Sequence, residues 1–499
     1  MEAFSAGLPT FLLVVVYVVG LNVLGVWLGR GQKNARDYFL GGHAMPWWTV
    51  MASIVATETS ALTFLSVPGD AYRSGYTFLQ LVFGYVAGRI VVAFLLLPGY
   101  FEREIPTAYA LLETRFGTRA RRLTSLLFLV TRALAAAVRL AVPAIPIALI
   151  LKIPVWAAIL ILAAGTTVYT LFGGIKADIW IDSIQMFQYL TGALVALIFL
   201  LLQVPGGLSG AFAAHAAAGD PVRLFDFALD FARPYTFWAG LVGGAFLTMA
   251  THGADQLIVQ RLLACRGLRD AQKALIGSGL LVLVQMTLFT TIGVLLFALF
   301  RGRSFATPDE IFPTYMVREL PPWVSAYLVA GIFSAAMCSE SSARNSLASA
   351  LALDLVGPLT GDAALEGRRG LVLGRALTLF WTFALAGLAA GFSLLPMTQP
   401  SVQVALSLAS VTAGGLLGAF LLARFARRVS ESDLLWAILL STVFLLVLWL
   451  GSKGWIDFPP GRAVAWPWYS LIGACLTCAA GLLLSRRHPP LRGPIDSEA

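Results

Sequence analysis

Two short polar runs interrupt apolar stretches of the chain, and they hold the residues best suited to bind a ligand. They are Ala56-Thr57-Glu58-Thr59-Ser60 and Cys338-Ser339-Glu340-Ser341-Ser342, the second followed by Arg344 and Asn345. Hydroxyl, carboxylate and carbonyl oxygens are ligands that a small hard cation such as sodium prefers. The runs therefore predict a cation site that uses the Ser339 hydroxyl and, where a helix unwinds, the Ala56 carbonyl. The competing interpretation is that the serines only permit close helix packing.

Ionisable side chains also lie inside apolar segments, where each is costly unless it is paired or faces water. They are Glu58, Arg89, Arg132, Arg139, Asp182, Asp255, Glu340 and Arg344. Each is a functional candidate by default. Glu340 and Arg344 are four residues apart, which favours a pair between them on one helix.

The composition indicates the elements that must position these residues. The chain has 499 residues, of which 58% are hydrophobic and 12% charged, whereas soluble domains carry about 25% charged residues. Apolar runs of about 20 residues recur, each long enough to cross a bilayer as a helix. The fold class is therefore all-α, a polytopic bundle of about thirteen transmembrane helices. The predicted helices span residues 7–30, 46–68, 76–99, 121–151, 153–172, 181–203, 235–262, 275–300, 321–356, 370–393, 401–425, 433–451 and 466–485.

Basic residues gather in alternate loops, and this pattern predicts the orientation. If Met1 lies outside, most lysines and arginines fall in the loops after odd-numbered helices, so those loops and the C-terminus are cytoplasmic. These residues include Arg30, Lys33, Arg36, Arg115, Arg119, Arg121, Arg122, Arg261, Arg266, Arg269, Lys273, Arg424, Arg427 and Arg428. The net charge of +9 thus marks orientation in a lipid bilayer and not a nucleic-acid partner.

Several kinds of chemistry are disfavoured by the sequence. Cys475 and Cys478 have metal-ligand spacing, but no second pair or histidine is near them, so we interpret them as helix residues. No set of nucleophile, base and orienting residue indicates an enzyme. The longest polar gaps, 204–234 and 301–320, are predicted extracellular loops, so residues 1–499 form a single transmembrane domain.

Helices two and seven are predicted to be interrupted, because the first contains the polar run at 56–60 and the second is rich in glycine. Each opens a block of five helices. This arrangement predicts two inverted repeats, 46–203 and 235–425, with the solute held where they meet. Helices within 7–30 and 433–485 are then peripheral.

Several motifs resemble those of the sodium:solute symporter family, which includes sodium/glucose, sialic acid, proline and iodide transporters. They are Asp37-Tyr38-Phe39-Leu40-Gly41-Gly42, the segment from Ala56 to Tyr72 with Pro68, Arg115-Phe116, Gly173-Gly174-Ile175-Lys176-Ala177 with Trp180, Asp182 and Gln185, and Asp255-Gln256 with Val259-Gln260-Arg261. The resemblance covers nearly the whole chain. It implies a leucine-transporter-like fold with inverted five-helix repeats, helices 2–6 and 7–11. The segment with Ser60, Thr63 and Phe64 looks closest to the sialic acid and iodide or vitamin-type branches.

The resemblance also implies sodium sites. The main one lies between helices two and nine, with carbonyls of Ala56, Thr59 and Ala335 and side chains of Cys338 and Ser339. Relatives usually have a hydroxyl in place of Cys338, and a thiol is a poor ligand for a hard cation. A second site, found in some relatives, would use Asp182, Ser339, Ser341 and Ser342. One or two sodium ions are therefore expected.

The solute of such relatives lies beside the break in helix two. By position, the contact candidates are Glu58, Ser60, Thr63, Phe78, Gln80, Thr251 and His252. The sialic acid branch has an arginine on helix four where this chain has Ala135, with Arg139 one turn later, so Arg139 is a further candidate. Glu58 has three open interpretations: it pairs with Arg139 or Arg89, it binds solute amine or hydroxyl groups, or it takes up a proton.

The resulting prediction is a secondary active transporter that couples sodium to a small polar organic solute by alternating access. The solute is a sugar, carboxylate, amino acid or vitamin-like compound, and compact loops are typical of a bacterial inner membrane. A proton-coupled transporter that uses Glu58, Glu340 or His252 is the first alternative. A membrane solute sensor is the second alternative. The sequence argues against it, because the chain ends soon after Arg486 and Arg487 with no signalling extension.

Overall fold

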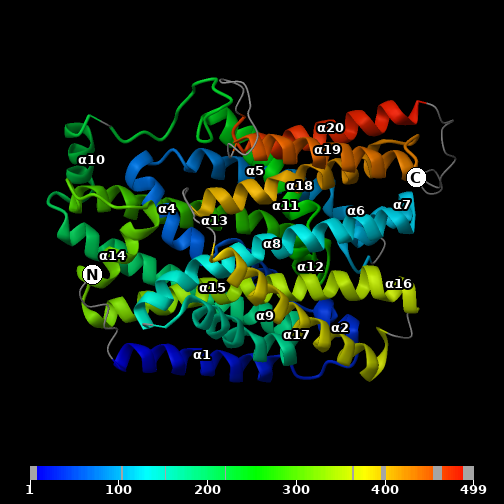
Figure 1. Cartoon of the computed structure of the whole chain (residues 1–499), viewed down its shortest axis with the longest axis horizontal. Coiled ribbons are helices and arrows are strands. Elements are labelled where there is room, and N and C mark those ends of the chain that lie inside the picture. Colours follow the sequence, from blue (N-terminus) through cyan, green and yellow to red (C-terminus); the bar gives the residue numbers. More distant parts are fainter. Residues whose placement is uncertain are drawn as a thin grey trace.

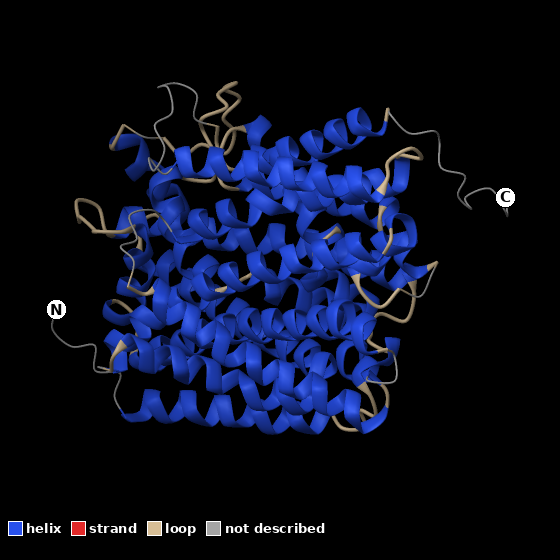
Figure 2. Ribbon diagram, turned by 45° about the vertical axis from the view of Figure 1, so that its right-hand side comes forward, coloured by secondary structure: helices blue, strands red, loops and turns tan. Residues whose placement is uncertain are grey.

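Long helices packed side by side make up the molecule (Figures 1 and 2). The computed structural model describes residues 8–102, 105–151, 153–219, 221–361, 365–394, 401–452 and 464–486. This described part contains no β-strand. Within it, eight helices are long and apolar enough to cross a membrane, and a bent pair of helices makes a ninth candidate span. The prediction of an all-α membrane protein is confirmed.

Each predicted transmembrane segment coincides with a helix or with a broken helix. The unbroken helices are α1 (Leu8–Leu28), α8 (Thr118–Leu151), α13 (Leu268–Leu299), α17 (Gly367–Phe392), α18 (Ser401–Phe425), α19 (Glu431–Ser452) and α20 (Trp468–Ser485). The broken or kinked ones are α3 (Trp47–Glu58) with α4 (Ala61–Ser74), α5 (Leu79–Leu95) with α6 (Leu97–Phe101), α9 (Val155–Gln203), the π-helix η2 (Ala239–Gly243) with α11 (Gly244–Gly253) and α12 (Gln256–Leu263), and α15 (Pro322–Ala350) with the π-helix η4 (Leu351–Val356) and α16 (Gly357–Thr360).

Shorter elements connect these helices at the two ends of the bundle. They are α2 (Ala35–Leu40), η1 (Gly41–His43), α7 (Ala108–Phe116), α10 (Gly207–Ala217), η3 (Pro308–Glu310) and α14 (Ile311–Arg318). Helices α10 and α14 lie at the end where α1 begins, whereas α7 lies at the end where α20 finishes (Figure 1). The two long gaps predicted as extracellular loops therefore sit at one end, and each contains a short helix.

Helix α9 differs from the prediction. Two helices with a connection at 173–180 were expected, but one helical run of 49 residues crosses that region, and at about 1.5 Å per residue it is far too long for one crossing. It divides at Gly174, where φ is +55° and ψ is −158°. Such a backbone conformation favours glycine, so the chain turns within one residue and needs no loop.

The break between α3 and α4 bends the chain by 65°. Thr59 and Ser60 both have extended backbone, with ψ of 96° and 170°, so the helical hydrogen-bond ladder stops there. The last carbonyls of a helix have no partner within it. The polar run in the sequence thus corresponds to a place where carbonyl oxygens lack a partner within their own helix.

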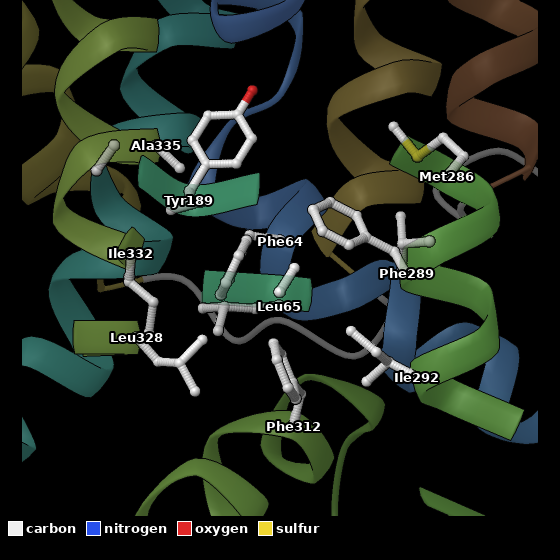
Figure 3. Close-up of a cluster of buried hydrophobic side chains, with 14 of the residues drawn as sticks. Phe64, Leu65, Tyr189, Met286, Phe289, Ile292, Phe312, Leu328, Ile332 and Ala335 are labelled. Atoms are coloured by element: carbon white, nitrogen blue, oxygen red, sulfur yellow. The ribbon is translucent and has the colours of Figure 1, made fainter. Parts of the chain in front are cut away.

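A cluster of buried apolar side chains fills the space beyond this break, around Phe64 of α4 (Figure 3). The Phe64 ring lies 5.4 Å from the rings of both Phe289 and Phe312 and 6.4 Å from that of Tyr189, measured between ring centroids. These rings come from α13, α14 and α9, and aromatic packing of this kind adds to the hydrophobic burial. The cluster holds α4 against its neighbours on the side toward α14.

Candidate functional site

Three backbone carbonyl oxygens converge on one side chain at the break. The Cys338 Sγ of α15 lies 3.0 Å from the Ala56 oxygen, 3.4 Å from the Ala335 oxygen and 4.0 Å from the Thr59 oxygen. Cys338 is fully buried. The structure therefore brings together four of the five residues predicted for the main sodium site, from two helices that are far apart in sequence.

Two hydroxyl groups near this point have other partners. The Ser339 hydroxyl donates to the Ala336 carbonyl of its own helix at 3.0 Å. The Thr59 hydroxyl accepts a hydrogen bond of 2.6 Å from the Gln285 side chain on α13. A cation here would be held mainly by carbonyl oxygens, which suit a hard ion.

Asp182 on α9 lies in a second buried polar cluster. Its Oδ2 atom accepts from the Ser53 hydroxyl at 2.7 Å and from the Ser342 hydroxyl at 3.4 Å. It also pairs with the Arg261 guanidinium at 3.2 Å, and both charged side chains have no exposure. The Ser341 hydroxyl instead donates to the Cys338 carbonyl at 3.2 Å. Of the residues predicted for a second sodium site, Asp182 and Ser342 are thus brought together, beside an arginine that already carries a positive charge.

Arg261 requires a correction. The sequence pattern counted it among the basic residues of a cytoplasmic loop, but it lies on α12 and is fully buried. Its guanidinium also donates to the Ser53 hydroxyl at 3.0 Å and to the Leu257 carbonyl at 3.0 Å. Compensation by Asp182 is the physical reason that the charge is tolerated there.

Glu58, at the end of α3, pairs with Arg89 of α5, as one of the three interpretations expected. Arg89 is fully buried and also donates to the Ser278 hydroxyl at 3.1 Å. The His252 Nε2 atom lies 3.7 Å from the same Glu58 oxygen, and its Nδ1 atom is 2.9 Å from the Thr251 hydroxyl. The break therefore carries a carboxylate whose charge is balanced by an arginine.

Arg139 of α8 lies on the other side of the break. Its Nη1 atom donates a long hydrogen bond of 3.4 Å to the Thr57 carbonyl, and the side chain is half-buried. Arg89 and Arg132 each have a carboxylate partner, Glu58 and Asp255 respectively. Among the residues that the structure describes, Arg139 has no such partner, so its charge is available to a bound anion.

Four other predicted solute contacts differ in their surroundings. Ser60 and Thr63 lie at the start of α4 and are buried. Phe78 packs edge-on against Tyr235, with ring centroids 5.5 Å apart. The Gln80 amide donates to the Thr77 and Tyr235 carbonyls and accepts from the Asp226 N–H. The last two therefore anchor the connection before η2.

Sequence reasoning missed Gln285, Ser53 and the buried role of Arg261. Gln285 is a single amide in an apolar helix, which gave no spacing to interpret. Arg261 stands in the quoted motif Val259-Gln260-Arg261, so its signal was present. What could have identified it is that the apolar residues Val259 and Leu262 flank it on other sides of the same helix.

Glu340 and Arg344, which were expected to pair, are 3.9 Å apart. The Arg344 guanidinium donates to the Thr166, Thr167 and Thr382 hydroxyls. This pair is therefore a loose one, and most of the stabilisation of Arg344 comes from the threonines of α9 and α17.

Comparisons with known proteins agree with this architecture. The model of the sodium:solute symporter family matches residues 38–441. The sodium/sialic acid symporter NanT of Aliivibrio fischeri is 27% identical over 507 aligned positions, covering 100% of this chain and 96% of that protein. The human sodium/iodide cotransporter is 28% identical, covering 93% of this chain and 73% of that protein.

A solved structure has the same fold. It is a substrate-bound, outward-open sodium-coupled sialic acid symporter, which is similar with a TM-score of 0.85 and 24% sequence identity. The match covers 97% of this chain and 99% of that one. The overall fold described above is therefore that of a solved structure.

Proposed function

Since the chain belongs to the sodium:solute symporter family, we propose that it moves a small anion together with sodium through the break between α3 and α4. Members of this family are transporters and not enzymes, and this chain is accordingly a sodium-coupled symporter in a membrane. We propose which residues bind sodium, which charge the solute carries and how the chain is oriented in the membrane.

The observation that carries the sodium site is the convergence of the Ala56, Ala335 and Thr59 carbonyl oxygens on the Cys338 thiol. These oxygens belong to α3, to the break and to α15. A cation bound among them would join these elements, so its affinity would depend on how they are packed. Sodium and solute can then each favour the same arrangement, which is the thermodynamic basis of coupling.

The Ser339 hydroxyl is the remaining proposed ligand of this site. In the structure it donates to a carbonyl one turn earlier in α15, and such a bond leaves the lone pairs of the hydroxyl oxygen available to a cation. Ser339 follows Cys338 in α15, and both side chains are buried.

A second sodium ion at Asp182 is also part of the proposal. Its Oδ1 atom is buried and has no hydrogen-bond partner among the described residues, whereas Oδ2 is shared by Ser53, Ser342 and Arg261. Oδ1 is thus the atom a second ion would use. One sodium with a monovalent anion moves no net charge, whereas two sodium ions move one. Uptake that responds to the membrane potential would therefore support the second site.

Arg139 supports an anionic solute. It is the half-buried arginine at the break that lacks a carboxylate partner in the described part of the chain. Arginine binds carboxylates through two parallel hydrogen bonds, and its charge favours other anions as well. The named relatives transport sialic acid and iodide, both of which are anions in neutral water. Glu58 does not oppose this, because Arg89 balances its charge.

The test is uptake by purified protein in proteoliposomes, with sodium or potassium outside. The panel contains sialic acid, pyruvate, iodide, glucose and proline. We expect sodium-dependent uptake of at least one of the three anions, and a loss of at least tenfold in Arg139→Gln. The matched control is Arg233→Gln, which removes an exposed arginine paired with Asp226.

Sodium-dependent uptake of glucose that is unchanged in Arg139→Gln would overturn the anionic solute and leave sodium coupling intact. Uptake without sodium that instead follows a pH gradient would overturn sodium coupling and move that role to Glu58 or His252.

We further propose the bacterial inner membrane as the location, with the loop after α12 cytoplasmic. The support is the clustering of basic residues in alternate loops.

A further inference from the structure

Helix α8 presents two arginines on one face. Arg132 and Arg139 are seven residues apart, which is close to two turns and about 10 Å along the helix. Two small residues, Ala135 and Ala136, lie between them and are nearly fully buried. Arg139 is at the break, and Arg132 lies toward the end where α8 begins, the cytoplasmic end in the proposed orientation.

The Arg132 guanidinium has one carboxylate partner and a small exposed fraction. It pairs with Asp255, with side-chain exposures of 10% and 14% for the two partners. Its guanidinium carbon lies 6.0 Å from the centre of the Phe128 ring. The Nε atom is buried and donates no hydrogen bond to any described residue. One side of this guanidinium therefore has no fixed partner.

Asp255 has two separate functions, one for each oxygen. Oδ1 accepts a 2.9 Å hydrogen bond from the Leu257 N–H and so caps the start of α12, while Oδ2 contacts Arg132. Loss of the Arg132 contact leaves the cap in place. The negative charge of the Asp255 carboxylate would then still interact favourably with the N-terminus of α12.

A narrow cavity lies beside this pair. It is bounded by α8, α11 and α18 and lined by Thr131, Arg132, Ala135, Thr251, Asp255 and Thr412, among others. Thr251 is adjacent to His252, which contacts Glu58. The cavity thus adjoins the solute site and contains a guanidinium, three hydroxyl groups and small side chains.

From this geometry we propose that Arg132 is a second anion site, which the solute occupies after it leaves Arg139. The inference rests on the proposed function, because it requires an anionic solute. In the structure the Asp255 carboxylate occupies the position of the anion. The solute's anionic group displaces Asp255 from Arg132, and Asp255 returns when the solute has left.

This exchange keeps the solute anion beside an arginine at each step, and the released Asp255 keeps the favourable partial charge at the N-terminus of α12. An anion that leaves Arg139 without a new partner would be unpaired inside the protein, which is costly. At Arg132 one carboxylate replaces another, so the arginine keeps a negative partner while the released Asp255 still caps α12. The Arg132–Asp255 contact also joins α8 to the junction of α11 and α12. When this ion pair opens, α11 and α12 are held less firmly against α8.

The test uses the transported anion among sialic acid, pyruvate and iodide. Net uptake is measured in proteoliposomes, and equilibrium binding is measured by calorimetry with the purified protein in sodium. In Arg132→Gln we expect net uptake to fall at least tenfold while affinity at the first site changes less than threefold. In Asp255→Asn, which keeps the cap but removes the charge, we expect two anions to bind per protein where wild type binds one.

The double variant Arg132→Gln, Asp255→Asn guards against misfolding, because it leaves neither charge unpaired. It is expected to transport as slowly as Arg132→Gln and to bind one anion. The matched control is Arg233→Gln with Asp226→Asn, an ion pair on the connection before η2, which is expected to behave as wild type.

Wild-type uptake in Arg132→Gln or in the double variant overturns the inference, and so does a single bound anion in Asp255→Asn. If Arg139→Gln abolishes binding while the Arg132 and Asp255 variants are unchanged, only the second site fails. If none of the three anions binds to the wild type, the proposed function fails and the second site with it.

Discussion

At the level of single residues, the main sodium site contains one side chain that does not match its expected chemistry. Cys338 contacts three carbonyl oxygens at the break, but sulfur is a soft ligand and sodium is a hard cation. The thiol also donates its hydrogen to the Ala56 oxygen, which is the reverse of what an ion would require. Wild-type affinity for sodium is therefore expected to be below what the same carbonyls provide with a hydroxyl.

Cys338→Ser is expected to bind sodium more tightly, with a half-saturating concentration at least threefold lower, because a serine oxygen can coordinate the ion. Sodium-dependent thermal stabilisation of the purified protein measures this. Cys475→Ser, which changes an exposed cysteine on α20, should leave sodium binding unchanged. Weaker binding in Cys338→Ser would mean that the thiol is not beside the ion.

Asp182 and Arg261 give a second residue-level prediction. Asp182→Asn leaves the fully buried Arg261 without its carboxylate, and loss of one partner of a buried pair costs about 3–5 kcal/mol. Asp226→Asn removes a carboxylate from a pair whose arginine is exposed, where the cost is about 0–1 kcal/mol. Equilibrium unfolding in mixed micelles should separate the two variants clearly. Equal stability of both would refute a buried Asp182–Arg261 pair.

At the level of elements, the sequence predicts where a helix is interrupted better than how sharply the chain turns there. The polar run at Glu58, Thr59 and Ser60 predicted the interruption between α3 and α4. The division of α9 at Gly174 was expected as a loop, because hydropathy shows where a helix loses apolar character and not how sharply the chain turns. The positive φ of Gly174 could not be inferred from composition.

Gly174→Ala is expected to destabilise the protein by at least 1–3 kcal/mol, roughly the cost of a strained backbone residue. A Cβ atom at this position would also lie 2.5 Å from the Tyr38 carbonyl oxygen. On the same helix, Gly165→Ala places its Cβ at an ordinary 3.5 Å from Val18, so a neutral or slightly stabilising effect is expected. Thermal melting of both variants checks this, and equal melting temperatures would contradict the kink.

At the level of the whole molecule, hydropathy predicted the positions and order of the helical segments, because each must contain enough apolar residues to cross the bilayer. The lateral arrangement could not be predicted in this way. Lipid-facing and buried helix faces are both apolar, so nothing in the pattern indicates that α15 packs against α3. For the candidate site, motif resemblance supplied Ala56, Thr59, Ala335 and Cys338. It did not supply Gln285 or the buried role of Arg261, because their partners come from other helices.

The two ends of α13 provide a test of orientation. Arg269 and Ser304 are exposed near its opposite ends. Arg269→Cys is expected to react with a membrane-impermeant maleimide only from the cytoplasmic side, and Ser304→Cys only from outside. The native Cys265 should stay silent, because burial raises the pKa of its thiol to about 12 and little thiolate is present at neutral pH. The reverse labelling pattern would invert the proposed topology.

The apolar cluster around Phe64 (Figure 3) has a consequence for how well the cell keeps its sodium gradient. It consists of buried apolar side chains packed against α4, the helix that begins at the break, so we expect that an ion could pass α4 only if the rings of Phe64, Phe289 and Phe312 separate. A leak of sodium through the protein would dissipate the gradient that drives uptake. The packed aromatic cluster would therefore limit sodium leakage when no solute is present. If these aromatic residues were replaced by small ones, we expect sodium to leak through the protein without solute.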